Sequence, residues 1–183
     1  MIISPTYINE LFVAQTTLIK DSRGSFSRLF CIKDLTKVFG ERNIVQINQS
    51  ITTDVGAVRG MHFQYPPHSE MKLVRCIRGK VWDVAVDMRK GSPAFLKWYA
   101  EELSGENQKM MIIPEGFAHG FQVLEPDSQL LYLHTAFYSS SSEGGIHPMD
   151  PVISIEWPLT VTQLSIKDEL RPMINQEFKG ISI

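Results

Sequence analysis

Cationic and imidazole side chains share one stretch of apolar, strand-type sequence. Residues 58–64 carry Arg59 and His62, and Lys72 and Arg75 follow after a short turn. Charged groups near a core are costly unless an anionic ligand or a reaction uses them. A neutral histidine can take a proton from carbon when a cation such as Lys72 or Arg59 holds the enolate oxygen that forms. We therefore place the candidate site here and predict acid-base chemistry.

Such a base needs a carboxylate to orient it and an acid for a second proton transfer. Asp168 and Asp83 are candidates for the carboxylate on sequence grounds alone. Tyr132 and Tyr138 lie on or just after one predicted strand and face the same side, so either phenol could be the acid. Packing between strands is the alternative role for both tyrosines. A second histidine, His119, occupies a turn-to-strand stretch and adds to the candidate site.

Two other kinds of site have weaker support. A metal site needs three or four N/O donors, but His62 is followed by Phe63 and Gln64, and a protonated Lys72 would repel a cation. We therefore expect no metal. Nucleophilic catalysis is also weakly indicated, because neither cysteine neighbours a histidine and the serine run at 139–142 lacks a nucleophile-elbow context.

Composition limits the classes of protein that fit. The 183 residues, 43% of them hydrophobic and 21% charged, predict one globular domain spanning 1–183. A net charge of -2 and a pI near 6.2 give no general attraction to nucleic acid or anionic membranes. No signal peptide or long apolar run is evident, so we expect a soluble cytoplasmic protein. Cys31 and Cys76 are expected to be buried free thiols.

Short strands separated by glycine, proline and asparagine turns predict an all-β fold, an antiparallel jelly-roll sandwich or barrel with short peripheral helices. A turn at 20–25 should join two extended segments as a hairpin. Residues 34–39, ended by Gly40, predict a helical turn, and Ser165-x-x-Asp168 predicts a short helix near the end of the chain. The strands are expected at residues 25–30, 43–51, 58–64, 72–77, 82–88, 95–100, 109–113, 120–124, 129–137 and 152–157.

Motifs along nearly the whole chain resemble the dTDP-4-dehydrorhamnose 3,5-epimerase family. They include Asp21-x-Arg23-Gly24-x-Phe26, Gln46-x-Asn48-x-Ser50, Arg59-Gly60-x-His62-x-Gln64, Lys72-Leu73-Val74 and Pro114-x-Gly116-Phe117-Ala118-His119-Gly120-Phe121. The resemblance implies a metal-free cupin jelly roll without cofactor, usually a homodimer. It also implies an epimerase that inverts C3, C5 or both of a nucleotide-diphosphate-linked 4-keto-6-deoxyhexose, in deoxysugar (O-antigen or similar glycan) biosynthesis.

Carried onto matching residues, the resemblance implies a role for each. His62 would remove the proton α to the C4 ketone and pair with Asp168, Lys72 would steady the enolate oxygen, and Tyr132 would protonate the opposite face. The substrate-binding positions would be Gln46, Ile47, Asn48, Arg59, His119, Tyr138, Glu143 and Lys167. An N-terminal segment with Arg23 and Phe26 would enter the partner's site.

Two departures from the family pattern bear on the substrate. Arg28 stands where the family usually has glutamate, and Leu133-His134 follow the tyrosine where it usually has lysine. A guanidinium can only donate hydrogen bonds, while cytosine offers two acceptors, so we hypothesise that Arg28 favours a CDP-linked over a dTDP-linked sugar. Inversion at C3 alone stays open, because one C4 ketone activates both centres. The rival functions are a non-catalytic sugar-nucleotide-binding cupin and a 3,4-ketoisomerase.

Overall fold

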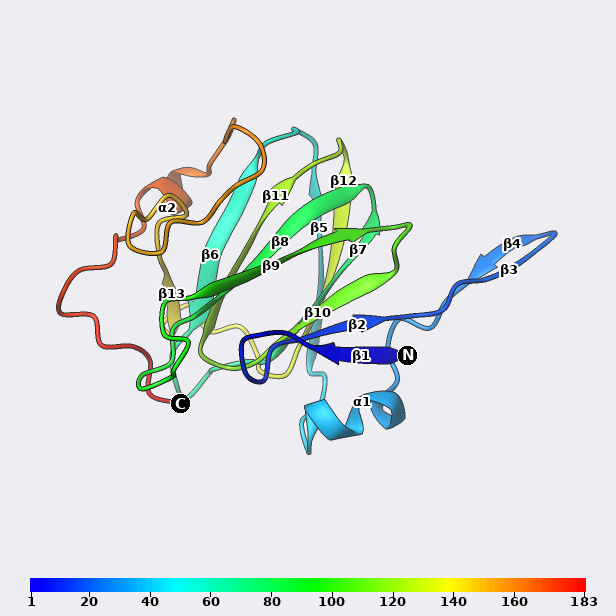
Figure 1. The fold of residues 1–183 in the computed structure, drawn as a ribbon, viewed down its shortest axis with the longest axis horizontal. Helices are drawn as coiled ribbons and strands as arrows, with labels where there is room; N and C mark the ends of the chain where they lie inside the picture. Colours follow the sequence, from blue (N-terminus) through cyan, green and yellow to red (C-terminus); the bar gives the residue numbers. More distant parts are fainter.

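Two antiparallel sheets form the body of the computed structural model, which describes residues 1–183 (Figure 1). The six-stranded sheet runs in the order β1 (Ile2–Pro5), β2 (Phe12–Gln15), β10 (Lys109–Ile113), β7 (Lys72–Arg78), β12 (Ser128–His134) and β5 (Gln46–Thr52). The five-stranded sheet runs β13 (Glu143–Gly145), β6 (Val58–Gln64), β11 (Phe117–Val123), β8 (Lys80–Asp87) and β9 (Trp98–Ser104). The predicted antiparallel all-β class with few short helices is confirmed.

The sheets bury their facing sides because apolar residues alternate along the strands. Val74 on β7 packs with Ala85 and Phe121 of the other sheet in one core cluster. Its neighbour Leu73 points to the opposite side, where it packs with Leu35 of helix α1 (Ile32–Phe39). The predicted helical turn ended by Gly40 is thus confirmed, and this helix covers the outer side of the six-stranded sheet.

Strand register brings distant polar residues side by side. On β12, Tyr132 lies opposite Asn48 of β5, and His134 lies opposite Lys72 of β7. In the other sheet, His119 of β11 lies opposite His62 of β6. Because directly opposed residues point to the same face of a sheet, these side chains line the space between the two sheets.

Two predicted strands differ from the structure: the one at residues 25–30 ends at Phe26 with β4 (Gly24–Phe26), and the one at residues 152–157 is absent. At 152–157 the physical reason is visible. The segment is a turn and coil wrapped around Asp150, whose Oδ1 accepts hydrogen bonds from the backbone N–H of Val152 and Ile153. The carbonyl oxygen of Asp150 accepts a third, from Ser154, which has a φ of 51°. These local bonds take the place of a ladder, while Ile153 still packs in the core. Strand β13, at one edge of the five-stranded sheet, and strand β1, at one edge of the other, were not predicted.

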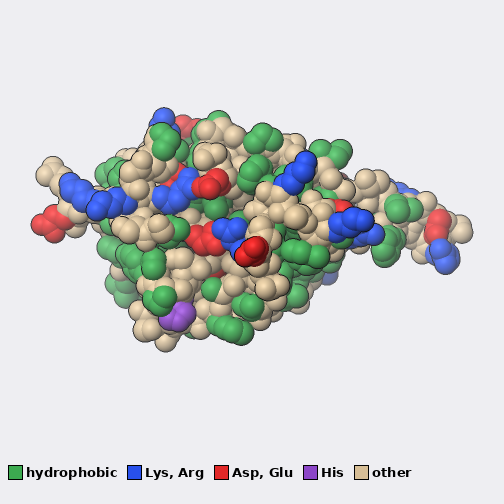
Figure 2. All heavy atoms as spheres, turned by 90° about the horizontal axis from the view of Figure 1, so that it is seen from below, with side chains coloured by type: hydrophobic (Ala, Val, Ile, Leu, Met, Phe, Trp, Pro, Cys, Tyr) green, Lys and Arg blue, Asp and Glu red, His purple; other side chains and the backbone are tan.

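The predicted hairpin near the N-terminus is an arm that projects from the body. It consists of β3 (Ile19–Asp21) and β4 (Gly24–Phe26), and it stands clear of the sheets with apolar and charged side chains on its surface (Figures 1 and 2). Phe26 is 67% exposed. Arg23 contacts Asp21 of the same hairpin. None of the helices is long and apolar enough to span a lipid bilayer.

Candidate active site

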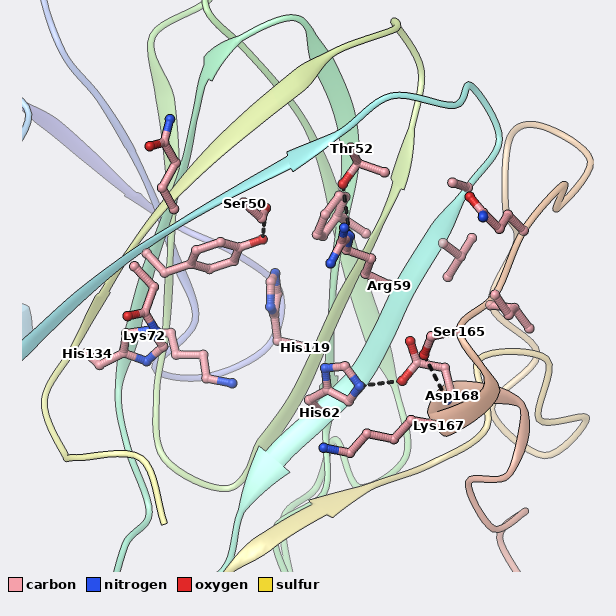
Figure 3. Close-up of a pocket in the computed structure, with 18 residues that line it drawn as sticks. Ser50, Thr52, Arg59, His62, Lys72, His119, His134, Ser165, Lys167 and Asp168 are labelled. Carbon is pink, nitrogen blue, oxygen red and sulfur yellow. Dashed lines mark hydrogen bonds and ion pairs between the residues drawn. The ribbon is translucent and has the colours of Figure 1, made fainter. Parts of the chain in front are cut away.

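A cavity of about 510 Å³ opens between the ends of the two sheets (Figure 3). This volume is typical of a small-molecule site. The structure brings together there eight residues singled out from the sequence, namely Asn48, Arg59, His62, Lys72, His119, Tyr132, Lys167 and Asp168. This cavity is therefore the candidate active site.

His62 and Asp168 form a close pair on the wall built by the five-stranded sheet. His62 Nε2 lies 2.6 Å from Asp168 Oδ1. Asp168 lies in the four-residue helix α2 (Ile166–Glu169). Its backbone N–H donates to the Ser165 hydroxyl, which caps the start of the helix as the sequence predicted. Burial opposes ionisation of Asp168, but the hydrogen bonds from His62 and its neighbours outweigh it and lower the pKa of the carboxyl. The ionised carboxylate holds an N–H of the ring, which leaves the second ring nitrogen facing the cavity as a proton acceptor (Figure 3).

Three cationic side chains surround the same space. Lys72 is only 12% exposed and reaches in from β7. Arg59 on β6 is steadied by Thr52, whose hydroxyl accepts from Nε at 2.9 Å. Lys167 on α2 pairs with Glu143 at 2.7 Å. Fixed positive charge around a cavity suits a diphosphate and an oxyanion.

Tyr132 provides a phenol on the opposite wall, built by the six-stranded sheet. Its hydroxyl lies 2.8 Å from the Ser50 hydroxyl, and burial raises its pKa, so the phenol keeps its proton. The ring contacts His119 edge-on, with the ring centroids 6.2 Å apart. His119 Nε2 in turn lies 2.7 Å from Asp83, a carboxyl whose pKa is raised by burial. Asp83 therefore orients His119, and Asp168 is the partner of His62.

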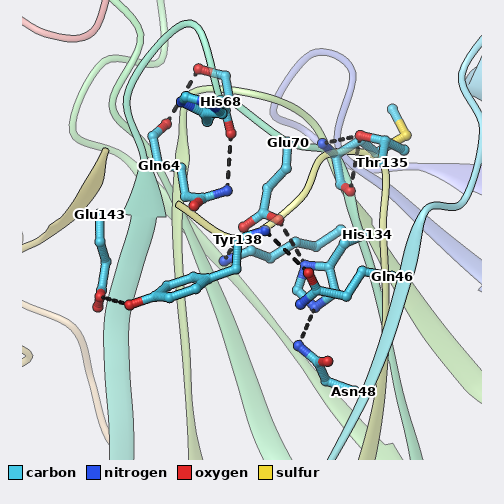
Figure 4. A network of polar contacts seen from close by, with 12 residues as sticks. Gln46, Asn48, Gln64, His68, Glu70, His134, Thr135, Tyr138 and Glu143 are labelled. Carbon is cyan, nitrogen blue, oxygen red and sulfur yellow. Dashed lines mark hydrogen bonds and ion pairs between the residues drawn. The ribbon is translucent and has the colours of Figure 1, made fainter. Parts of the chain in front are cut away.

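The other predicted site residues lie outside this cavity. Arg23, Phe26 and Arg28 belong to the arm and the segment after it, and Arg28 pairs with Asp34 at 3.5 Å. Ile47 points to the opposite side of β5 from Asn48 and is 60% exposed. The remaining three form a neighbouring group at the rim (Figure 4): Gln46 and Glu143 both hydrogen-bond to Tyr138.

Sequence reasoning missed several residues that line the cavity. Ser50 and Thr52 follow Asn48 at every second position of β5, and His134 follows Tyr132 in the same way on β12. The motif Gln46-x-Asn48-x-Ser50 already placed Ser50 on the same face as Asn48, and the same period of two could have identified Thr52 and His134. Gln163 and Ser165, which precede α2, carry no such local signal.

The arrangement suits proton abstraction and return on opposite faces of one carbon. The imidazole of His62 belongs to one sheet and the phenol of Tyr132 to the other, with Lys72 beside the space between them. No three His, Cys, Asp or Glu side chains gather as a metal site. The polar groups supply a base, an acid and an oxyanion partner, the three components that enolisation with inversion requires.

Comparison with known proteins gives consistent matches over most of the chain. Residues 5–176 match the model of the dTDP-4-dehydrorhamnose 3,5-epimerase family. A dTDP-4-dehydrorhamnose 3,5-epimerase from Sinorhizobium fredii is 43% identical, over 92% of this chain and 89% of the relative. An epimerase from Legionella pneumophila, solved with dTDP-4-keto-L-rhamnose, superposes with a TM-score of 0.91 at 39% identity, covering 99% and 98% of the two chains. A 3′-monoepimerase from Streptomyces bikiniensis, solved with dTDP-quinovose, gives 0.86 at 30% identity, covering 92% and 86%.

Proposed function

The chain belongs to the dTDP-4-dehydrorhamnose 3,5-epimerase family, and we propose that its cavity inverts C3 and C5 of a dTDP-linked 4-keto-6-deoxyhexose by enolisation. It is an isomerase of deoxysugar biosynthesis. The observation that carries the residue assignment is the placement of an imidazole–carboxylate pair and a buried phenol on opposite walls of one cavity. Enolisation with protonation from the far side needs this geometry.

Each step uses a side chain at the cavity. His62 takes the proton from C3, the C–H electron pair forms the C3–C4 double bond, and the C4 carbonyl becomes an enolate. Lys72 donates to the enolate oxygen, while Asp168 stabilises the imidazolium that His62 becomes. As the C4 carbonyl re-forms, Tyr132 protonates C3 from the other face. His62 then releases the abstracted proton to solvent, and Tyr132 regains a proton from solvent. The same sequence at C5 completes the double inversion.

We propose that the cationic side chains bind the nucleotide diphosphate and that the residues at the cavity rim bind the base and sugar. Arg59 and Lys167 suit the diphosphate, and His119 adds a donor at the cavity wall. Tyr138 and Glu143 at the rim are proposed to contact the base and sugar, together with Gln46 and Asn48 on β5. The similar proteins are a dTDP-4-dehydrorhamnose 3,5-epimerase and two epimerases solved with dTDP-linked sugars, so we propose dTDP as the nucleotide. The hypothesis that Arg28 favours CDP stays a prediction.

Incubation with dTDP- and CDP-4-keto-6-deoxyglucose in D2O tests the proposal. NMR should show deuterium at C3 and C5 with inverted configuration, and faster turnover of the dTDP sugar. A non-catalytic binder would exchange no deuterium, and a ketoisomerase would give a 3-keto product. Faster turnover of the CDP sugar would favour the Arg28 hypothesis instead.

Inversion at C3 alone is the second candidate function, because the similar Streptomyces bikiniensis protein is a 3′-monoepimerase. Its chemistry would use His62, Lys72 and Tyr132 in the same way, without the second enolisation. The D2O experiment separates the two functions, since a monoepimerase leaves the configuration at C5 unchanged.

We also propose a homodimer in which the arm enters the partner's site, with residues 1–183 acting as one domain. The exposed Phe26 and the projection of the arm from the body support this arrangement. The domain assignment is supported by the cavity, which draws residues from position 48 to position 168. Arg23→Ala/Phe26→Ala and His62→Asn subunits should each be poorly active, and mixing them should restore activity by forming one complete site. Mixtures no more active than their components would argue against an exchanged arm.

A further inference from the structure

A buried carboxylate lies behind the cavity and accepts hydrogen bonds from two sides. Glu70, in the turn before β7, receives Lys72 Nζ on Oε1 at 3.1 Å. Its Oε2 receives His134 Nδ1 at 2.8 Å (Figure 4). The side chain of Glu70 is 8% exposed. Each oxygen of this buried acid thus has a basic side chain as its donor, and both donors border the cavity.

The histidine of this network is itself fixed in place. The amide nitrogen of Asn48 lies 3.3 Å from His134 Nε2, and the imidazole stacks on Tyr132 with the ring centroids 6.2 Å apart. An amide N–H can donate only to an unprotonated ring nitrogen, so the proton of the neutral imidazole lies on Nδ1 and points at Glu70. Hydrogen bonds therefore run from Asn48 through His134 to one oxygen of Glu70, and from Lys72 to the other oxygen.

The network keeps Glu70 ionised. Burial opposes ionisation, but the hydrogen bond from His134 and the attraction of Lys72 outweigh it and lower the pKa of Glu70. Lys72 thus has a fixed negative partner in a cavity that is otherwise rich in positive charge. An ammonium buried without such a partner tends to lose its proton, and a neutral amine would hold an enolate poorly.

The geometry also limits the direction in which the lysine points. One of its three N–H bonds is directed to Oε1, which leaves the other two available to the cavity. A carboxylate close to a developing enolate would repel it. The donor from His134 offsets this repulsion, because it stabilises negative charge on the oxygen farther from Lys72.

We propose that Glu70 and His134 are positioning residues that keep Lys72 protonated and aimed at the C4 oxygen of the substrate. The inference rests on the proposed function, in which Lys72 holds the enolate. Because negative charge develops on that oxygen only as the enolate forms, the network acts on the transition state. Its loss should therefore lower kcat more than it raises KM.

Several other charged or titratable groups lie at or near the cavity that Lys72 lines, and a pH experiment has to allow for them. They are Arg59 and His62 on β6, Asp83 on β8, His119 on β11, Tyr132 and His134 on β12, and Lys167 and Asp168 on α2. All of them are left intact when Glu70 alone is changed. A shift in the pH profile of a Glu70 variant therefore reports the loss of the Glu70 charge.

Glu70→Gln in the full-length enzyme tests the inference. We expect kcat for deuterium exchange to fall roughly ten- to hundredfold, KM to stay within about threefold, and the alkaline limb of kcat to move to lower pH by about one unit. Glu115→Gln is the control, because both oxygens of Glu115 also accept from a basic side chain, Arg42 at 2.7 and 2.9 Å, but Glu115 lies outside the cavity. This control should match wild type in all three values.

Two further comparisons exclude a merely structural effect. On a Lys72→Met background, Glu70→Gln should lower kcat by less than about threefold, because the lysine through which it acts is gone. His134→Ala should lower kcat, and His134→Asn should restore most of it, since the Asn amide can replace Nδ1–H as the donor to Glu70.

The inference is overturned if Glu70→Gln behaves as Glu115→Gln does, or if its loss of kcat is unchanged on the Lys72→Met background. If Glu70→Gln does not fold, the comparison of His134→Ala with His134→Asn tests the inference instead. Equal kcat values and equal alkaline limbs of the pH profile in these two variants would overturn the inference. Absence of deuterium exchange in wild type would instead refute the proposed function.

Discussion

Replacing Asp168 with Asn tests the assignment of His62 as the base. The carboxylate oxygen lies 2.6 Å from His62 Nε2, and the side chains of Asp168 and His62 are 4% and 35% exposed, so solvent screens the interaction only from the histidine side. A hydrogen bond to a charged group contributes about 1.5–3 kcal/mol. At about 1.4 kcal/mol per factor of ten, losing that bond to the imidazolium should slow enolisation roughly ten- to hundredfold.

The assay is single-turnover deuterium exchange at C3, which reports proton abstraction separately from product release. Asp150→Asn is the control, because Asp150 is also buried but accepts only from backbone N–H groups. It should lower stability without slowing exchange in the folded protein. A His62→Asn/Asp168→Asn double variant should be no slower than His62→Asn alone. Normal exchange in Asp168→Asn, or losses that multiply in the double variant, would refute the pairing.

Three other changes give distinct outcomes. Tyr132→Phe removes the acid, so deuterium should still enter at the enolised carbon while inversion, followed by NMR, falls by roughly a hundredfold or more; undiminished inversion would assign the acid elsewhere. Gly60→Ala should destabilise the protein, because the residue has a φ of 133° and an added Cβ would lie 2.6 Å from Gly120 Cα; an unchanged melting temperature would contradict this. The pKa of Glu143 is about 2: burial raises it, but the hydrogen bonds from Lys167 and Tyr138 lower it more. The stability that this depressed pKa provides is present above the usual pKa of 4.5 and should be lost as pH falls toward 2, so the acid limb of a melting-temperature profile should weaken in Glu143→Gln.

Local patterns predicted most of the strands and several site residues. Short apolar stretches between glycine, proline and asparagine turns located β7, β8 and β12, and Ser165-x-x-Asp168 located the start of α2. Such signals depend on neighbours within a few residues, which the sequence displays directly. The same reasoning failed at residues 152–157, where the side chain of Asp150 competes with the ladder for backbone N–H groups.

The sequence by itself determined that a base, an acid and cations would lie on strands of an antiparallel jelly roll, because residue type and period are local properties. Only the tertiary structure decided which groups meet. Residue type and spacing left both Asp83 and Asp168 eligible as the partner of His62, and only the family resemblance favoured Asp168. Nothing in the sequence gave a reason to join Glu70 to His134. Those pairs depend on strand register and on the docking of α2 against β6, which arise from packing between segments that are far apart in the chain.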